Sequence, residues 1–158
     1  MKEPEPATSG VRFPPPLIFV LGLFAGFLIQ RRIPVPIASW GTRTSRVAGG
    51  LVAAVGIALA MWAVAVFHRV GTSPNPTKPT AALAGAGPYR FSRNPMYVGL
   101  TLLAVGVALA FNALWLLVSV PVSLWILATT TVAKEERYLE ALFGDAYRDY
   151  KRRVRRWL

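Results

Sequence analysis

The sequence predicts an all-α integral membrane protein with about four transmembrane helices and a C-terminal amphipathic helix. Three observations support this fold class. Hydrophobic residues make up 54% of the 158 residues, a high share for a soluble domain. No Asp or Glu occurs between Glu5 and Glu135. Residues 94–133 carry no charge, and this run is long enough for two crossings because one crossing takes about 20 helical residues.

The uncharged segments set the expected helix boundaries. We expect transmembrane helices at about 13–30, 47–67, 95–111 and 113–133. The first segment is longer than the apolar region of a usual signal peptide, and two arginines follow it where small residues would mark cleavage, so we interpret it as a retained helix. Residues 1–12 are expected to form a flexible tail, and 13–158 a single domain.

The third helix should begin at Asn94-Pro95. Asn is favoured at the N-cap and Pro at the first helical position, so free N–H groups should face the interface there. Such helix ends attract anions.

The chain becomes amphipathic after Ala133, which predicts an interfacial helix over about 134–156. Gly144 and Asp145 should interrupt it, since Gly ends helices and Asp begins them. We interpret the basic run 151–157 as an anchor to lipid.

The basic charge fits a membrane flank better than a nucleic-acid partner. Lys and Arg number 18 against seven Asp and Glu, a formal charge of +11, and eight of the basic residues follow Ala133. Cytoplasmic flanks of membrane helices show this bias, with anionic lipids as the counter-charge. A cytoplasmic C-terminus and four spans would place the N-terminus and residues 68–93 on the same side. We infer no nucleic-acid binding.

Residue counts exclude several enzyme classes. The chain has no cysteine, which rules out disulfides, thiolate ligands and cysteine nucleophiles. His68 is the single histidine and cannot build a histidine metal site. We therefore predict no metal centre.

Antiparallel spans would bring residues 87–99 and the pair Glu135-Glu136 to one interface. S-adenosylmethionine carries an ammonium, a carboxylate, a sulfonium and a ribose diol, so glutamates, helix N–H groups and tyrosines could each meet part of it. Methyl transfer needs alignment and desolvation more than acid or base groups. The same residues also fit plain interfacial anchors, and composition leaves both interpretations open.

A resemblance favours the enzyme. Gly-Pro-Tyr, then Arg93-Asn94-Pro95-Met96-Tyr97-Val98-Gly99, two spans, Glu135-Glu136 and a basic ending resemble the isoprenylcysteine carboxyl methyltransferases and their phospholipid methyltransferase relatives over about the last 90 residues. The resemblance implies S-adenosylmethionine as cofactor, S-adenosylhomocysteine as its product, and a hydrophobic or lipid-linked acceptor entering from the bilayer. It also implies an active site on the cytoplasmic side, and the short chain suggests a bacterial inner membrane.

The resemblance implies catalytic roles for Arg93, Asn94 and Tyr97. It implies cofactor contacts from Ala81, Leu83, Ala84, Gly87, Tyr89, Arg93, Asn94, Pro95, Tyr97, Gly99, Glu135 and Glu136.

Two positions depart from the family. Asn94 stands where the family has histidine and cannot ionise. Thr131 and Val132 occupy the region where the prenylcysteine enzymes carry an arginine suited to a substrate carboxylate. The acceptor and the oligomeric state stay open, as do two alternatives: an NADPH-dependent enzyme like the sterol reductases, and a non-enzymatic membrane protein with a decayed site.

Overall fold

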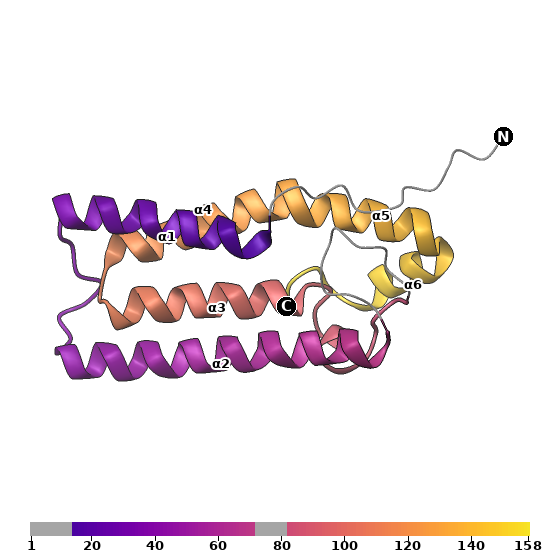
Figure 1. Cartoon of the computed structure of the whole chain (residues 1–158), viewed down its shortest axis with the longest axis horizontal. Helices are drawn as coiled ribbons and strands as arrows, with labels where there is room; N and C mark the ends of the chain where they lie inside the picture. The colour runs from indigo at the N-terminus through magenta and orange to yellow at the C-terminus, as the bar shows by residue number, and fades with distance from the viewer. Residues whose placement is uncertain (1–13, 72–81) are drawn as a thin grey trace.

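A computed structural model describes residues 14–71 and 82–158, and this part of the chain is helical with no strand. Figure 1 shows its longer helices running side by side along the long axis of the molecule. The elements are α1 (Pro15–Arg32), α2 (Thr42–Arg69), the 3-10 turn η1 (Gly87–Arg90), α3 (Pro95–Ala110), α4 (Leu114–Leu127), the π turn η2 (Ala128–Val132), α5 (Ala133–Phe143) and α6 (Asp145–Arg153).

The all-α membrane fold is confirmed. Among the described residues, three helices are long and apolar enough to cross a membrane: α1, α2 and the continuous helix Leu114–Phe143, which joins α4, η2 and α5. The remaining predicted helix, α3, is apolar but has 16 residues and therefore spans about 24 Å. In the bundle, α1 packs on α4 and α2 packs on α3.

The two ends of the bundle differ in structure. The α1–α2 and α3–α4 connections lie at one end, and α5 and α6 lie at the other (Figure 1). Asn112 joins the two connections, because its Oδ1 accepts the N–H groups of Ile37 at 3.0 Å and Ala38 at 3.1 Å. The first loop and the Asn112 turn therefore lie at the same end of the bundle, as expected when successive spans alternate in direction. The candidate residues gather at the other.

Small residues allow α2 and α3 to touch through their backbones. A Cβ on Gly56 would lie 2.6 Å from the carbonyl oxygen of Gly99, and a Cβ on Gly106 would lie 2.5 Å from the backbone nitrogen of Ala53. Side chains do not tolerate such distances, so glycine at these positions sets the spacing of the two helices. The spacing in turn fixes where the first turn of α3 meets the interface.

Gly49→Ala should destabilise the bundle by about 1 to 3 kcal/mol, because the new methyl group would collide with the backbone of Gly106 and Ala110. Gly50→Ala is the matched control, since a Cβ there meets nothing within 4 Å. Equilibrium unfolding of the detergent-solubilised variants measures the difference. Equal stability of the two variants would contradict the close α2–α3 contact.

The C-terminal region differs from a single interfacial helix over 134–156. The first half, α5, continues the α4 helix directly through η2, and the second half, α6, folds back toward the bundle (Figure 1). Gly144 separates them with φ of +53°, as its position next to Asp145 predicted. The helix ends at Arg153, and Val154 is extended with φ of −123° and ψ of +131°. The last five residues thereby return to the candidate site.

Candidate active site

Four segments meet at the α5 end of the bundle. The turn η1 and the residues after it supply Tyr89, Arg93 and Asn94, and the first turn of α3 supplies Tyr97. The first turn of α5 supplies the acidic pair. The C-terminal segment, residues 154–158, supplies the fourth side. These segments are far apart in sequence and come together because the spans run antiparallel.

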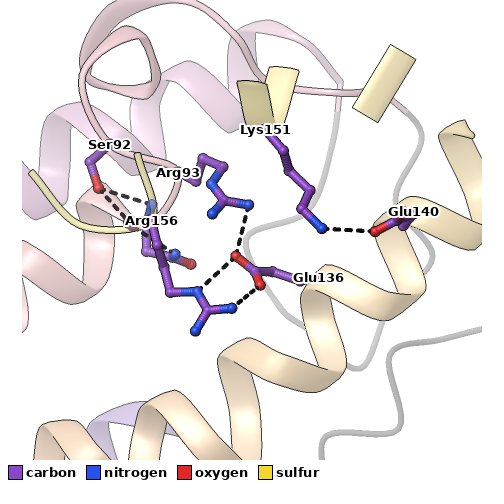
Figure 2. A network of polar contacts seen from close by, with 7 residues as sticks. Ser92, Arg93, Glu136, Glu140, Lys151 and Arg156 are labelled. Atoms are coloured by element: carbon purple, nitrogen blue, oxygen red, sulfur yellow. Dashed lines mark hydrogen bonds and ion pairs between the residues drawn. The ribbon is translucent and has the colours of Figure 1, made fainter. Parts of the chain in front are cut away.

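The two glutamates of the pair have different partners. The Tyr97 hydroxyl donates a hydrogen bond of 2.7 Å to Oε1 of Glu135. Glu136 instead lies between two arginines, as Figure 2 shows, with Arg93 Nη1 at 2.9 Å from Oε1 and Arg156 Nη2 at 2.5 Å from Oε2. Consecutive helical residues point about 100° apart, which explains the separate environments. Glu136 is neutralised within the protein, whereas Glu135 has a neutral hydrogen-bond donor.

The ion pair of Glu136 is largely removed from solvent. Glu136 is 8% exposed, and the Arg93 side chain is 11% exposed. Arg156 is 44% exposed and its Nε donates a second hydrogen bond of 3.1 Å to Glu136. The neighbouring pair of Lys151 and Glu140 in Figure 2 is much more exposed. Breaking the Glu136 pair would leave a buried charge, so we assign it a structural role.

The C-terminal segment closes over the entry to α3. The carbonyl oxygen of Arg155 accepts the N–H of Arg93 at 2.9 Å, and that of Arg156 accepts the Asn94 side-chain amide at 2.9 Å. Ser92 Oγ also donates to the Arg156 carbonyl, at 3.3 Å. Trp157 packs against the core cluster that contains Tyr97. The anchor interpretation of residues 151–157 therefore fails for the last part of that run, which is tied to the site.

Asn94 occupies the N-cap position of α3, as predicted, but its side chain makes no capping hydrogen bond. Its amide is used to hold the carbonyl of Arg156. Its backbone N–H is satisfied by Ser92 Oγ at 3.1 Å. Sequence reasoning missed Ser92 and Arg156, since their roles depend on contacts across more than 60 residues of chain.

Buried tyrosines line the other side of the site. Tyr89 is 4% exposed, and its ring packs edge-on against Phe67 with the ring centroids 5.1 Å apart. The backbone carbonyl of Tyr89 accepts a hydrogen bond of 2.7 Å from the Tyr150 hydroxyl. Among the described residues the Tyr89 hydroxyl itself has no hydrogen-bond partner. Tyr147 is 1% exposed and belongs to the cluster with Tyr150.

Burial keeps these hydroxyls protonated. Burial, with smaller contributions from Tyr150 and Glu135, raises the pKa of Tyr89 far above its usual range. Burial raises the pKa of Tyr147 to about 12, with Glu136 adding to the effect and Arg93 opposing it. Burial also raises the pKa of Tyr150. Each of these side chains is therefore a hydrogen-bond donor at neutral pH, and the Tyr89 donor has no acceptor within the described parts of the chain.

The structure separates the candidate residues into two groups. It brings together Tyr89, Arg93, Asn94, Tyr97, Glu135 and Glu136. It places the others in packing contacts: Leu83 on the Tyr147 cluster, Ala84 beside Tyr89, Pro95 buried at the start of α3, Gly99 against α2, and Gly87 beside Trp62 and Val66 with φ of +57°. Ala81 lies outside the described residues.

The chemistry of the grouped residues suits a small molecule that carries both a positively charged and a negatively charged group. Glu135 can accept from an ammonium or hydroxyl group, and Tyr89 can donate. No cluster of three or more metal-ligating residues occurs in 14–71 or 82–158. The arrangement offers binding and orientation rather than a nucleophile.

Comparison with known proteins gives three matches. The sequence profile of the phospholipid methyltransferase family matches residues 44–146. An uncharacterized protein of Haemophilus influenzae is 43% identical over 65 residues, which are 40% of this chain and 100% of that protein. The protein-S-isoprenylcysteine O-methyltransferase of Schizosaccharomyces pombe is 31% identical over 68 residues, 43% of this chain and 29% of that enzyme. The match thus spans less than a third of the yeast enzyme, and no solved structure matches significantly.

Proposed function

Because this chain belongs to the phospholipid methyltransferase family, we propose that it transfers a methyl group from S-adenosylmethionine to a hydrophobic or lipid-linked acceptor at the membrane surface. The observation that carries the proposal is that Glu135, held by the Tyr97 hydroxyl, lies close enough to interact electrostatically with the buried Tyr89 hydroxyl, a donor that has no hydrogen-bond partner among the described residues. A buried donor without an acceptor costs about 1 to 3 kcal/mol unless a ligand satisfies it. A cofactor with hydroxyl, amino and carboxylate groups would satisfy both residues.

The residues fit this cofactor in complementary ways. Glu135 would accept hydrogen bonds from the ammonium or the ribose hydroxyls of the cofactor. The Tyr97 hydroxyl holds the Glu135 carboxylate in place through its hydrogen bond of 2.7 Å. Tyr89 would donate to an acceptor atom of the cofactor. Arg93 and Asn94 act by tying the C-terminal segment and Glu136 to this end of α3.

Bound S-adenosylmethionine supplies an electrophilic methyl group on a sulfonium. The protein then needs to align the acceptor and exclude water, because charge is lost in the displacement and a desolvated site favours that loss. The C-terminal segment contributes by covering the start of α3, where Trp157 packs against the cluster around Tyr97. The absence of cysteine and of a histidine pair in the sequence is compatible with this reaction.

The site is proposed to face the cytoplasm of a bacterial inner membrane. The eight basic residues after Ala133 lie at the site end of the bundle, and the opposite end carries Arg31, Arg32, Arg43 and Arg46. An excess of Lys and Arg marks the cytoplasmic side. Protease accessibility of a tag on the C-terminus in oriented vesicles would test this orientation.

Methyl transfer itself can be tested without knowing the acceptor. The purified protein is incubated with a bacterial lipid extract and S-adenosylmethionine labelled in its methyl group. The proposal expects label in the fraction extracted by organic solvent, and expects S-adenosylhomocysteine to inhibit the transfer. Absence of label, together with absence of S-adenosylhomocysteine binding, would favour a non-enzymatic protein.

Tyr89→Phe should weaken S-adenosylhomocysteine binding by roughly fivefold to tenfold while leaving stability unchanged or slightly raised, because its hydroxyl has no hydrogen-bond partner to lose in 14–71 or 82–158. Tyr150→Phe is the contrasting variant. It leaves the Tyr89 carbonyl without its donor at 2.7 Å and should cost about 1 to 3 kcal/mol of stability. If Tyr89→Phe loses stability without losing affinity, the hydroxyl has a structural role instead.

A further inference from the structure

An apolar groove lies between α1 and α4, which pack on each other, and none of its described lining residues belongs to α2. Its volume is about 820 Å³, within the range of small-molecule sites. Exposed aliphatic residues line it, among them Leu21 and Ala25 of α1 and Val118, Val122 and Ile126 of α4. These lining side chains are exposed on the surface of the bundle, so a chain within the bilayer can reach the groove.

Of the four described lining residues that carry a hydroxyl group, Thr131 is one, and the other three donate hydrogen bonds to backbone carbonyls. Ser119 Oγ donates to the carbonyl of Leu116 at 2.7 Å, Ser123 Oγ to that of Ile18 at 3.5 Å, and Thr130 Oγ1 to that of Ile126 at 2.6 Å. Satisfied hydroxyls offer little to a polar ligand. The body of the groove therefore suits a hydrocarbon chain.

One end of the groove is cationic. Lys134 is the single charged residue among the described residues that line it, and Arg137 follows one helical turn later on the same face of α5. Both side chains are exposed, and within the described parts of the chain neither forms an ion pair with a carboxylate. Glu140, the acidic residue one turn beyond Arg137, is paired with Lys151 instead. Two cations at this end are thus available to an anion.

The position of this cationic end matches the depth of lipid headgroups. Lys134 lies 20 residues after Leu114, the first residue of α4. At 1.5 Å per residue this is about 30 Å, the thickness of the hydrocarbon core. A lipid whose chain lies in the groove would have its phosphate beside Lys134 and Arg137.

We propose that this groove is a binding site for an anionic phospholipid, with one acyl chain between α1 and α4 and the phosphate on Lys134 and Arg137. The apolar lining favours an acyl chain, and the positive charges of Lys134 and Arg137 favour a negatively charged headgroup. The site is separate from Glu135 and Tyr89, so it stands whether or not the chain is a methyltransferase.

Native mass spectrometry of the detergent-purified protein tests this site. The probes are phosphatidylglycerol and phosphatidylcholine with identical acyl chains, titrated separately. The proposal expects tighter retention of phosphatidylglycerol by the wild type. Lys134→Gln with Arg137→Gln should weaken that binding by roughly 30-fold, since each basic residue near an anionic headgroup contributes about a fivefold preference. Arg69→Gln with Arg90→Gln removes two exposed charges from the same end without touching the groove and should leave binding unchanged.

Ala25→Phe tests the acyl-chain half of the proposal. The ring would fill the groove and should reduce retention of phosphatidylglycerol at least tenfold, whereas Ala58→Phe, at an exposed alanine of α2 outside the groove, should have no effect. Equal retention of the two lipids by the wild type, or equal effects of the two alanine substitutions, would overturn the proposal and leave nonspecific lipid around the bundle.

Discussion

Glu136→Gln should lower the free energy of unfolding by about 3 to 5 kcal/mol, because it leaves the buried Arg93 guanidinium without its counter-charge. The Arg93 side chain is 11% exposed and Glu136 is 8% exposed. The substitution also releases Arg156, so the C-terminal segment loses one of its contacts with α5. Equilibrium unfolding of the detergent-solubilised protein measures the loss.

Glu140→Gln provides the matched control on the same helix. Its partners are Lys151 at 2.9 Å and Arg148 at 3.9 Å, and all three side chains are at least one third exposed. Exposed pairs of this kind contribute about 0 to 1 kcal/mol. If the two variants were equally stable, Glu136 would not be the structural member of the acidic pair.

Glu135→Gln should weaken S-adenosylhomocysteine binding by roughly tenfold to hundredfold with little change in stability. Glutamine keeps an oxygen that accepts the Tyr97 hydroxyl, so the 2.7 Å hydrogen bond can persist. The lost charge removes a hydrogen bond to the ligand's ammonium or ribose, and bonds to charged groups contribute about 1.5 to 3 kcal/mol. Calorimetric titration of the variant beside wild type gives the affinity.

The two glutamates can be separated by this pair of measurements. The expected pattern is a loss of affinity for Glu135→Gln and a loss of stability for Glu136→Gln. The reverse pattern would exchange their roles. Unchanged affinity in both variants would remove the acidic pair from the proposed cofactor site.

Much of the fold follows from local sequence rules. Uncharged segments of the right length predict the apolar helices, Asn94-Pro95 predicts the start of α3, and Gly144 predicts the break between α5 and α6. The meeting of Tyr97 with Glu135 follows from antiparallel spans that begin and end at one interface. These features depend on periodicity, capping and span length, which can be read from short stretches of chain.

Other features depend on contacts that local patterns do not contain. The run 151–157 has the composition of a lipid anchor, yet Arg156 reaches Glu136 and its carbonyl holds Asn94, because α6 folds back after Gly144. Gly99 belongs to a motif associated with the cofactor, whereas its packing against Gly56 explains why glycine is needed there. The different partners of Glu135 and Glu136 likewise depend on which side of α5 meets the rest of the chain.

The most direct test of the central proposal is calorimetric titration of the purified protein with S-adenosylhomocysteine, run beside NADPH. The site around Glu135 and Tyr89 predicts saturable binding of S-adenosylhomocysteine and none of NADPH. Saturable binding of NADPH alone would contradict the methyltransferase proposal and point to a reductase. Binding of neither molecule would show that these residues do not form a cofactor site.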